Sequence, residues 1–237
     1  MKRVAILQSC YVPWKGYFDL LNSVDEFILY DDCQYTRQDW RNRNRIKTAG
    51  GTRWLTIPVT VEGLYRQRLD ETRVADTSWA EQHWDILRQS YRKAQHFDDL
   101  AGEIESSYGA CASENLLSLV NRRLLEVVCA TLDIRTKLSW STDYEATGSS
   151  TERVVSLCVE SEADIYVSGP RGRDYLDEGL FKDAGIELQY FDYDGYREYE
   201  QPHPPFEHNV SILDLLFSTG RDATSFMKSF GTVGSHG

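Results

Sequence analysis

The sequence predicts an α/β protein with a three-layer, mostly parallel sheet of the Rossmann-like or nucleotidyltransferase-like kind, carrying a helical insertion or cap. Two short apolar runs near the N-terminus, residues 4–7 and 27–30, have the length and composition of buried strands. Strand and helix patterns then alternate along the chain, as they do in parallel sheets covered by helices. Polar or glycine-bearing segments follow three of the predicted strands, and parallel strands place such segments at one edge of the sheet.

The predicted strands are short, rich in apolar residues and bounded by polar or glycine-containing segments. They cover residues 3–7, 26–30, 43–47, 53–57, 164–167 and 187–191. Ala49-Gly50-Gly51 separates the third strand from the fourth, which indicates a hairpin turn between them.

The predicted helices are marked by capping residues and by apolar residues at helical spacing. Ser78-Trp-Ala-Glu81 and Ser149-Ser-Thr-Glu152 are capping-box patterns, and Gly185 follows a helix in the position typical of a C-terminal cap. The expected helices cover residues 18–23, 78–93, 97–108, 114–132, 149–161, 174–184 and 211–217. No linker interrupts the pattern, so residues 1–237 are predicted to form a single domain in which residues 78–132 are the helical insertion.

Composition is typical of a soluble globular protein. Hydrophobic residues make up 41% of the chain and charged residues 27%, and no run approaches the roughly 18 apolar residues of a membrane helix. The apolar run that ends before Gln8 is too short for a secretory signal. The five cysteines are odd in number and never form Cys-x-x-Cys, which predicts reduced thiols, a cytoplasmic location and no structural zinc.

Charge is spread unevenly along the chain. The net charge is −11, yet residues 37–53 hold six basic residues and one acidic residue. A long nucleic acid would be repelled by most of this protein, whereas a small phosphorylated ligand could bind in the basic region. The alternative is a solvated basic loop, and Trp40 and Trp54 count against it because solvating loops rarely contain tryptophan.

Polar, aromatic and basic residues follow the first two strands, at the edge where parallel sheets bind ligands. The predicted ligand-binding residues there are Gln8, Tyr11, Trp14, Lys15, Gln34, Tyr35, Arg41, Asn42, Arg43 and Asn44. Tyr17 is a candidate catalytic residue, and Gly16 would let the backbone at a helix N-terminus approach an anion. Trp14-Lys-Gly-Tyr17 stands where adenylyl-transferring enzymes carry His-x-Gly-His, so the role of those histidines is not carried over.

A second candidate phosphate site follows the strand at residues 164–167. It comprises Ser168, Gly169, Arg171, Arg173 and Tyr175. A Ser-Gly turn with two arginines before a helix can hold phosphate through backbone N–H groups and guanidinium forks. The alternative is a tight connection that uses glycine and proline for geometry alone.

Candidate catalytic side chains are few. His208 could act as a base oriented by Asp214, although the favoured interpretation is that Ser211 and Asp214 cap the last helix. Cys10 is a candidate nucleophile, but free cysteine is more often a small buried apolar residue. The chain contains no paired histidine ligands and no Cys/His cluster, so no metal site is predicted.

Several of these residues fall into longer motifs that span nearly the whole chain. They are Gln8 with Tyr11-x-Pro-Trp-Lys-Gly-Tyr-Phe18, Asp25-x-Phe-Ile-x-Tyr-Asp31, Gln34-Tyr35, Trp40-x-Asn-Arg-Asn-x-Ile46, Trp54-Leu-Thr-x-Pro-Val59, Ser168-Gly-Pro-x-x-x-x-Tyr-Leu176 and Phe206-Glu-His-x-x-Ser-Ile-Leu-Asp-Leu-Leu216. In these motifs the chain resembles the WbqC-like family, whose members often accompany O-antigen and other polysaccharide biosynthesis genes. The family does not reserve the position of Cys10 for cysteine, which weakens the nucleophile hypothesis.

The resemblance implies a cytoplasmic transferase that forms an amide between an amino acid, such as glycine, and the amine of a nucleotide-activated amino sugar. The acyl donor would be made in place from ATP with Mg²⁺ or would arrive already activated, for example on tRNA. The alternatives are a non-catalytic sugar-nucleotide-binding subunit, an ATP-dependent adenylyl-transfer ligase and, on residues 37–53 alone, an RNA-binding module. The expected partner is therefore a small sugar nucleotide or other phosphorylated ligand, with no membrane partner and no nucleic acid other than tRNA.

Overall fold

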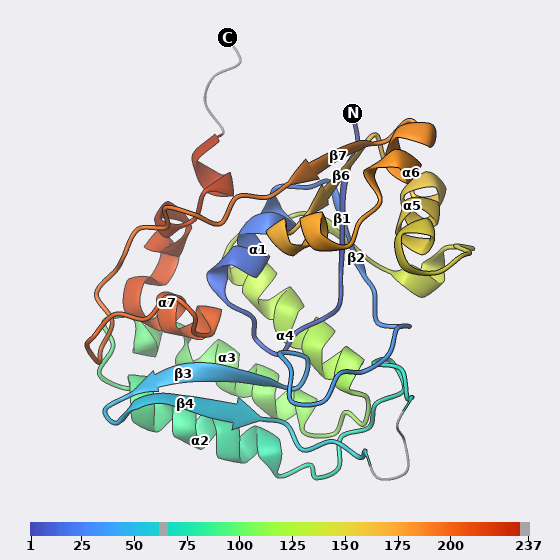
Figure 1. The fold of residues 1–237 in the computed structure, drawn as a ribbon. Coiled ribbons are helices and arrows are strands. Elements are labelled where there is room, and N and C mark those ends of the chain that lie inside the picture. The colour runs from blue at the N-terminus through green and yellow to red at the C-terminus, as the bar shows by residue number, and fades with distance from the viewer. Residues whose placement is uncertain (62–65, 233–237) are drawn as a thin grey trace.

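A five-stranded parallel sheet forms the centre of the computed structural model, which describes residues 1–61 and 66–232 (Figure 1). Its strands are β1 (Arg3–Leu7), β2 (Glu26–Leu29), β5 (Lys137–Trp140), β6 (Ile165–Ser168) and β7 (Glu187–Tyr190). They lie in the order β5-β2-β1-β6-β7, and every neighbouring pair is parallel. The predicted α/β class with a mostly parallel sheet is confirmed.

Helices cover both faces of the sheet, because alternate side chains of each strand point to opposite faces. Ala5 and Phe27 pack into a core with α1 (Lys15–Asn22) and α4 (Leu117–Thr131). Val4 and Ile28 point the other way, into a second core with α5 (Ser150–Glu160) and α6 (Glu178–Asp183). The three predicted layers are therefore present.

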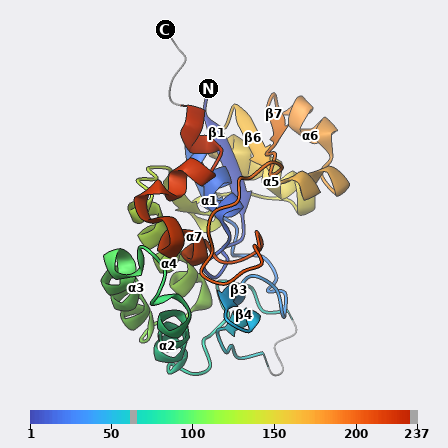
Figure 2. The same ribbon diagram turned by 90° about the vertical axis from the view of Figure 1, so that its left-hand side faces the viewer.

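An antiparallel hairpin and three further helices pack together beside the sheet (Figures 1 and 2). The hairpin consists of β3 (Arg43–Thr48) and β4 (Gly51–Thr56), and the helices are α2 (Trp79–Tyr91), α3 (Phe97–Cys111) and α7 (Ile212–Thr219). Within residues 78–132, α2 and α3 contact each other and α2 contacts the hairpin, while α4 belongs to a layer of the sheet.

The structure differs from the sequence-based expectation at one strand, β5, and at the start of one helix, α6. β5 was not predicted, because only Leu138 and Trp140 mark its four residues as a strand and it pairs only with β2 at the sheet edge. The helix expected at residues 174–184 is shorter and begins after Asp177, whose side chain accepts a hydrogen bond from the Gly179 N–H and so caps α6. A 3₁₀ turn, η2 (Pro170–Asp174), precedes it.

The remaining short elements are 3₁₀ turns, one directly after β5 and two near the C-terminus. They are η1 (Ser141–Asp143), η3 (Gly220–Phe226) and η4 (Ser229–Thr232). Among the described helices, none combines the length and the apolar character needed to cross a membrane. All five cysteines are free thiols, and four of them are buried.

Candidate functional site

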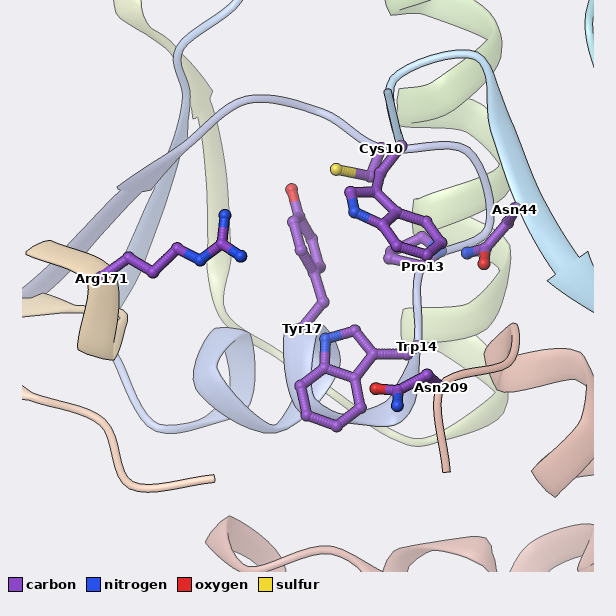
Figure 3. Close-up of a pocket in the computed structure, with 8 residues that line it drawn as sticks. Cys10, Pro13, Trp14, Tyr17, Asn44, Arg171 and Asn209 are labelled. Atoms are coloured by element: carbon purple, nitrogen blue, oxygen red, sulfur yellow. The ribbon is translucent and has the colours of Figure 1, made fainter. Parts of the chain in front are cut away.

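A cavity of about 430 Å³ lies where the loop after β1 and the turn after β6 come together (Figure 3). Its lining residues are Cys10, Pro13, Trp14, Tyr17, Trp40, Asn44, Arg171 and Asn209. Tyr17 from α1 and Arg171 from η2 line the same space, as expected for segments that follow parallel strands. Figure 3 shows the Arg171 side chain pointing toward Tyr17 across the cavity.

Trp14 forms an aromatic wall of the cavity, and Gly16 makes room for it. A Cβ atom at Gly16 would lie 2.3 Å from Cζ2 of the Trp14 indole, so only glycine fits beneath this ring. The indole packs against Tyr193 and Tyr196 at centroid distances of 5.2 and 5.8 Å. The predicted reason for Gly16, close approach of an anion, is therefore replaced by close approach of a side chain.

Cys10 and Tyr17 line the cavity, and Arg41, which is not a lining residue, contacts Cys10. The Arg41 guanidinium donates to Cys10 Sγ at 2.8 Å. Burial raises the pKa of the Cys10 thiol, and the opposing effect of Arg41 is smaller, so the structure gives the nucleophile hypothesis no support. Burial also raises the pKa of Tyr17 well above 10, and its hydroxyl donates to the Gln8 carbonyl at 3.1 Å. Tyr17 is thus a hydrogen-bond donor and not a base at neutral pH.

Arg171 is the member of the predicted Ser168–Tyr175 phosphate site that reaches the cavity. It is exposed, and it makes no hydrogen bond or ion pair with any residue that the structure describes. Arg173 instead lies 3.9 Å above the Tyr190 ring, and Tyr175 is 68% exposed to solvent. Ser168 is buried against Gly172, where a Cβ atom would lie 2.3 Å from Ser168 Oγ. Gly169 leads into η2 and does not line the cavity.

Three predicted ligand-binding residues hold the cavity walls together. Tyr11 is fully buried, and its hydroxyl pairs with His83 Nδ1 at 2.8 Å and with the Tyr108 hydroxyl at 2.7 Å. The Asn44 amide donates to the carbonyls of Tyr11 and Val12, and so fixes the loop after β1 to the hairpin. Asn42 donates to the Ile57 carbonyl at 2.8 Å. Asn44 alone among these also lines the cavity.

Lys15 does not line the cavity, so the described structure gives no support to its prediction as a phosphate ligand. Its side chain is buried, with the residue 3% exposed. The ammonium donates to the Arg197 carbonyl at 3.2 Å and lies 4.9 and 5.2 Å from the ring centroids of Tyr196 and Tyr199. Burial lowers the pKa of Lys15 to about 8, against the opposing attraction of nearby carboxylates. The sequence pattern could not show that this lysine points inward.

Gln8, which follows β1, and Gln34 and Tyr35, which follow β2, lie outside the cavity lining. Gln8 donates to Cys33 Sγ at 2.6 Å. Tyr35 is buried, and its backbone N–H donates to the Gln67 carbonyl. Gln34 is exposed and forms an isolated antiparallel bridge with Arg68. The contact of Gln8 connects the loops after β1 and β2, and those of Tyr35 and Gln34 connect the loop after β2 to the segment that follows the hairpin.

The predicted catalytic pair of His208 and Asp214 is not formed. The buried Asp214 carboxylate accepts hydrogen bonds from Tyr91, Tyr199 and Gln201 at 2.8, 2.7 and 2.8 Å. His208 packs edge-on against Phe206, and within residues 1–61 and 66–232 its buried Nδ1 has no partner. The cap function predicted for Ser211 is confirmed, since its side chain accepts from the Leu213 N–H.

Tryptophan and arginine side chains cover the outer face of the hairpin next to the cavity. The ring centroids of Trp40 and Trp54 lie 5.2 Å apart, and Arg43 Cζ lies 4.3 Å from the Trp54 centroid. Trp40 and Asn209 line the cavity although neither was a predicted site residue. Tryptophan within a basic run was a usable signal for Trp40, whereas Asn209 occupies an unspecified position of the motif at residues 206–216.

The part of the chain that the structure describes contains no group of three or more His, Cys, Asp or Glu side chains arranged to hold a metal ion. The described residues that line the cavity include no carboxylate. Mg²⁺ in nucleotide sites is commonly held by one or two carboxylates together with phosphate oxygens. The cavity lining therefore does not fit a protein-held Mg²⁺.

Comparison with known proteins places these features in a family. A model described as the WbqC-like protein family matches residues 8–226. A Mycobacterium tuberculosis (strain ATCC 25618 / H37Rv) protein named "Uncharacterized protein Rv1507c" is 50% identical over 228 residues, covering 96% of this chain and 98% of that protein. No solved structure gives a significant match.

Proposed function

The chain belongs to the WbqC-like protein family, and we propose that it is a transferase that joins an amino acid, such as glycine, to the amine of a nucleotide-activated amino sugar. The product would serve surface polysaccharide biosynthesis. The observation that carries this proposal is the cavity at the carboxyl edge of the sheet, in which Arg171, with no hydrogen-bond or ion-pair partner among the described residues, faces aromatic side chains. That combination suits a ligand with both a sugar ring and a phosphate.

The cavity has the size and chemistry for such a ligand. Its volume of about 430 Å³ falls within the range of roughly 300–1,000 Å³ for small-molecule sites. The rings of Trp14, Tyr17 and Trp40 offer apolar faces for a sugar, and the amide of Asn209 offers hydrogen bonds. Arg171 supplies a guanidinium that can bind phosphate oxygens in a fork.

The reaction forms one bond and breaks one bond. The sugar amine attacks the acyl carbonyl carbon, a C–N bond forms, and the leaving group departs with the electron pair of the broken bond. The ammonium then releases its proton to solvent. Binding both partners in one cavity supplies orientation. The Tyr17 hydroxyl would exchange its hydrogen bond to the Gln8 carbonyl for one to the acyl carbonyl oxygen as charge develops there.

The cavity lining favours an acyl donor that arrives already activated. Since no carboxylate among the described lining residues would hold Mg²⁺, we assign no step to ATP. An aminoacyl-tRNA or another aminoacyl ester would supply the carbonyl and the leaving group. The five free thiols support a cytoplasmic location for this reaction, because reducing compartments keep cysteines unpaired.

The test is a product assay with purified protein. The protein is incubated with a UDP-linked amino sugar and either glycyl-tRNA or glycine with ATP and Mg²⁺, and products are examined by mass spectrometry. We expect a new species heavier by one glycyl residue, formed with the wild-type protein and reduced with Arg171→Ala. Absence of any aminoacylated sugar nucleotide with every donor and amino acid tested would refute the proposal.

A non-catalytic sugar-nucleotide-binding subunit is the second candidate. It is favoured by one observation, which is that the Asp214 carboxylate is engaged by Tyr91, Tyr199 and Gln201 and does not orient His208. This candidate predicts sugar-nucleotide binding without turnover, and unchanged affinity in His208→Ala. Turnover in the product assay would eliminate it.

A further inference from the structure

Three side chains on the outer face of the hairpin and one from the turn before it form what we call the Trp–Arg platform: Arg43, Arg45 and Trp54, with Trp40. Arg45 lies directly opposite Trp54 in the antiparallel register, and Arg43 is two residues away on the same face. Arg43 Cζ is 4.3 Å from the Trp54 centroid, and Arg45 Cζ is 5.7 and 5.9 Å from the centroids of Trp54 and Trp40. The platform is thus a compact arrangement of two indoles and two guanidinium groups.

The hairpin does not need this face for its own packing. Its inner face carries Ile46 and Leu55, which are fully or almost fully buried in the main core. Trp40 and Trp54 are 41% and 42% exposed, and they are the tryptophans among the exposed large apolar side chains. Exposure of two neighbouring indoles to water costs free energy in the unliganded protein. Such exposed apolar groups often mark binding sites.

The two arginines also lack a charge partner. Neither Arg43 nor Arg45 forms an ion pair with any acidic residue in the described ranges, and Arg43 donates to the uncharged Gln38 carbonyl. Like charges close together on a strand face repel each other. An anion bound between the two guanidinium groups would remove that repulsion. A pair of arginines that needs an anion is unusual on a chain whose net charge is −11.

The platform is continuous with the cavity through Trp40, which belongs to both. The backbone holds Trp40 in place, because its carbonyl accepts a hydrogen bond from the Tyr11 N–H at 3.0 Å. A ligand that occupies the cavity can therefore extend onto the indoles without leaving the protein surface. Its two ends would meet different chemistry, with the platform at one end and Arg171 and Tyr17 at the other.

We propose that the Trp–Arg platform binds the nucleobase and the adjacent phosphate of a nucleoside diphosphate, whose sugar substituent enters the cavity. Indole faces stack on any base, and guanidinium groups bind phosphate. A small nucleotide fits the observations better than a long nucleic acid, because the basic face is confined to the hairpin of an acidic protein. This inference rests on the proposed function and names where its substrate is recognised.

The experiment compares nucleotide binding by the wild-type protein with that of Trp54→Ala and Trp54→Phe. Trp54 lies outside the cavity lining, so its replacement removes no side chain that lines the reaction site. The probes are UDP, UMP and the other common 5′-mononucleotides, with ribose 5-phosphate as the ligand without a base. Binding is measured by isothermal titration calorimetry, and folding of each variant is checked by circular dichroism.

We expect Trp54→Ala to weaken binding of UDP and UMP by about 5- to 100-fold, the usual loss for one base–aromatic stack. Ribose 5-phosphate should bind the wild-type and variant proteins equally, and Trp54→Phe should retain most of the nucleotide affinity. Trp140→Ala is the matched control. The Trp140 indole also packs against an arginine, with Arg122 Cζ 4.9 Å from the ring centroid, but Trp140 lies outside the platform and the cavity lining.

Failure of this inference is distinguishable from failure of the proposed function. If Trp54→Ala binds UMP as the wild type does, the nucleobase assignment is overturned, although aminoacyl transfer can still be observed. If the platform variants lose affinity for tRNA but not for mononucleotides, the face binds RNA and the small-nucleotide assignment is overturned. If Trp54→Ala weakens nucleotide binding but no acyl donor yields product, the nucleobase assignment holds and the proposed transferase function is refuted.

Discussion

Replacement of Asp214 by alanine tests whether this carboxylate is structural, as the structure indicates, or catalytic, as its place near His208 in the sequence suggested. The carboxylate is buried at the start of α7 and accepts three hydrogen bonds from Tyr91, Tyr199 and Gln201. Tyr91 in turn accepts from the Lys47 N–H at 2.9 Å. Asp214 thus connects the hairpin, α2 and the segment before α7.

The expected loss of stability follows from the three donors that the substitution leaves without an acceptor. Each buried unsatisfied donor costs about 1–3 kcal/mol. Because the three share one acceptor group, the losses are not fully additive, and we expect about 3–5 kcal/mol for Asp214→Ala. Asp214→Asn keeps the size and one acceptor oxygen, so a smaller loss of about 1–2 kcal/mol is expected. Against a typical stability of roughly 5–15 kcal/mol, the alanine variant should be severely destabilised.

The assay is urea unfolding followed by circular dichroism, with the free energy of unfolding obtained by linear extrapolation. Asp222→Ala is the matched control, because Asp222 is an exposed carboxylate in η3, close to α7 in the sequence. The control should unfold within about 0.5 kcal/mol of the wild type. An Asp214→Ala protein of wild-type stability that has lost turnover would refute the structural assignment and restore a catalytic one.

Three further predictions concern Arg171, Lys15 and Glu26. Arg171→Ala should weaken sugar-nucleotide binding by about 10- to 100-fold through loss of a charge-assisted contact. Its melting temperature should not change, since the side chain is exposed and has no described partner; a normal dissociation constant in titration calorimetry would exclude Arg171 from the site. Burial lowers the pKa of Lys15 from 10.5 to about 8. Between pH 8 and pH 10.5 the unfolded state therefore binds more protons than the folded state, and the contribution of Lys15 makes the free energy of unfolding rise with pH. Urea unfolding should show that rise in the wild type and not in Lys15→Met, and parallel curves for the two proteins would contradict the buried ammonium. Burial raises the pKa of Glu26, but hydrogen bonds from Lys2, Ser139, Tyr144 and Lys137 outweigh it and hold the pKa at about 2, below the ordinary 4.5. The stability that Glu26 contributes is therefore present above about pH 4.5 and lost as the pH falls toward 2; acid unfolding of Glu26→Gln should lack this loss, and an unchanged acid profile would contradict it.

The sequence by itself determined the parallel sheet, its two covering layers and the edge at which the cavity lies. These features follow from local patterns. Apolar runs of strand length mark β1, β2 and β6, and caps such as Ser211 mark helix starts. Parallel strands then place the segments after them at one edge. β5 escaped prediction because its four residues carry too few apolar side chains to form a pattern.

Only the tertiary structure decided which polar residues face the cavity. Tyr11, Lys15 and Arg171 all follow strands and all looked suited to a ligand, yet only Arg171 points into the space. Tyr11 and Lys15 find partners on distant segments, at Tyr108 and at the carbonyl of Arg197. The direction of a side chain depends on partners that folding brings from far along the chain, and a local pattern carries no information about them.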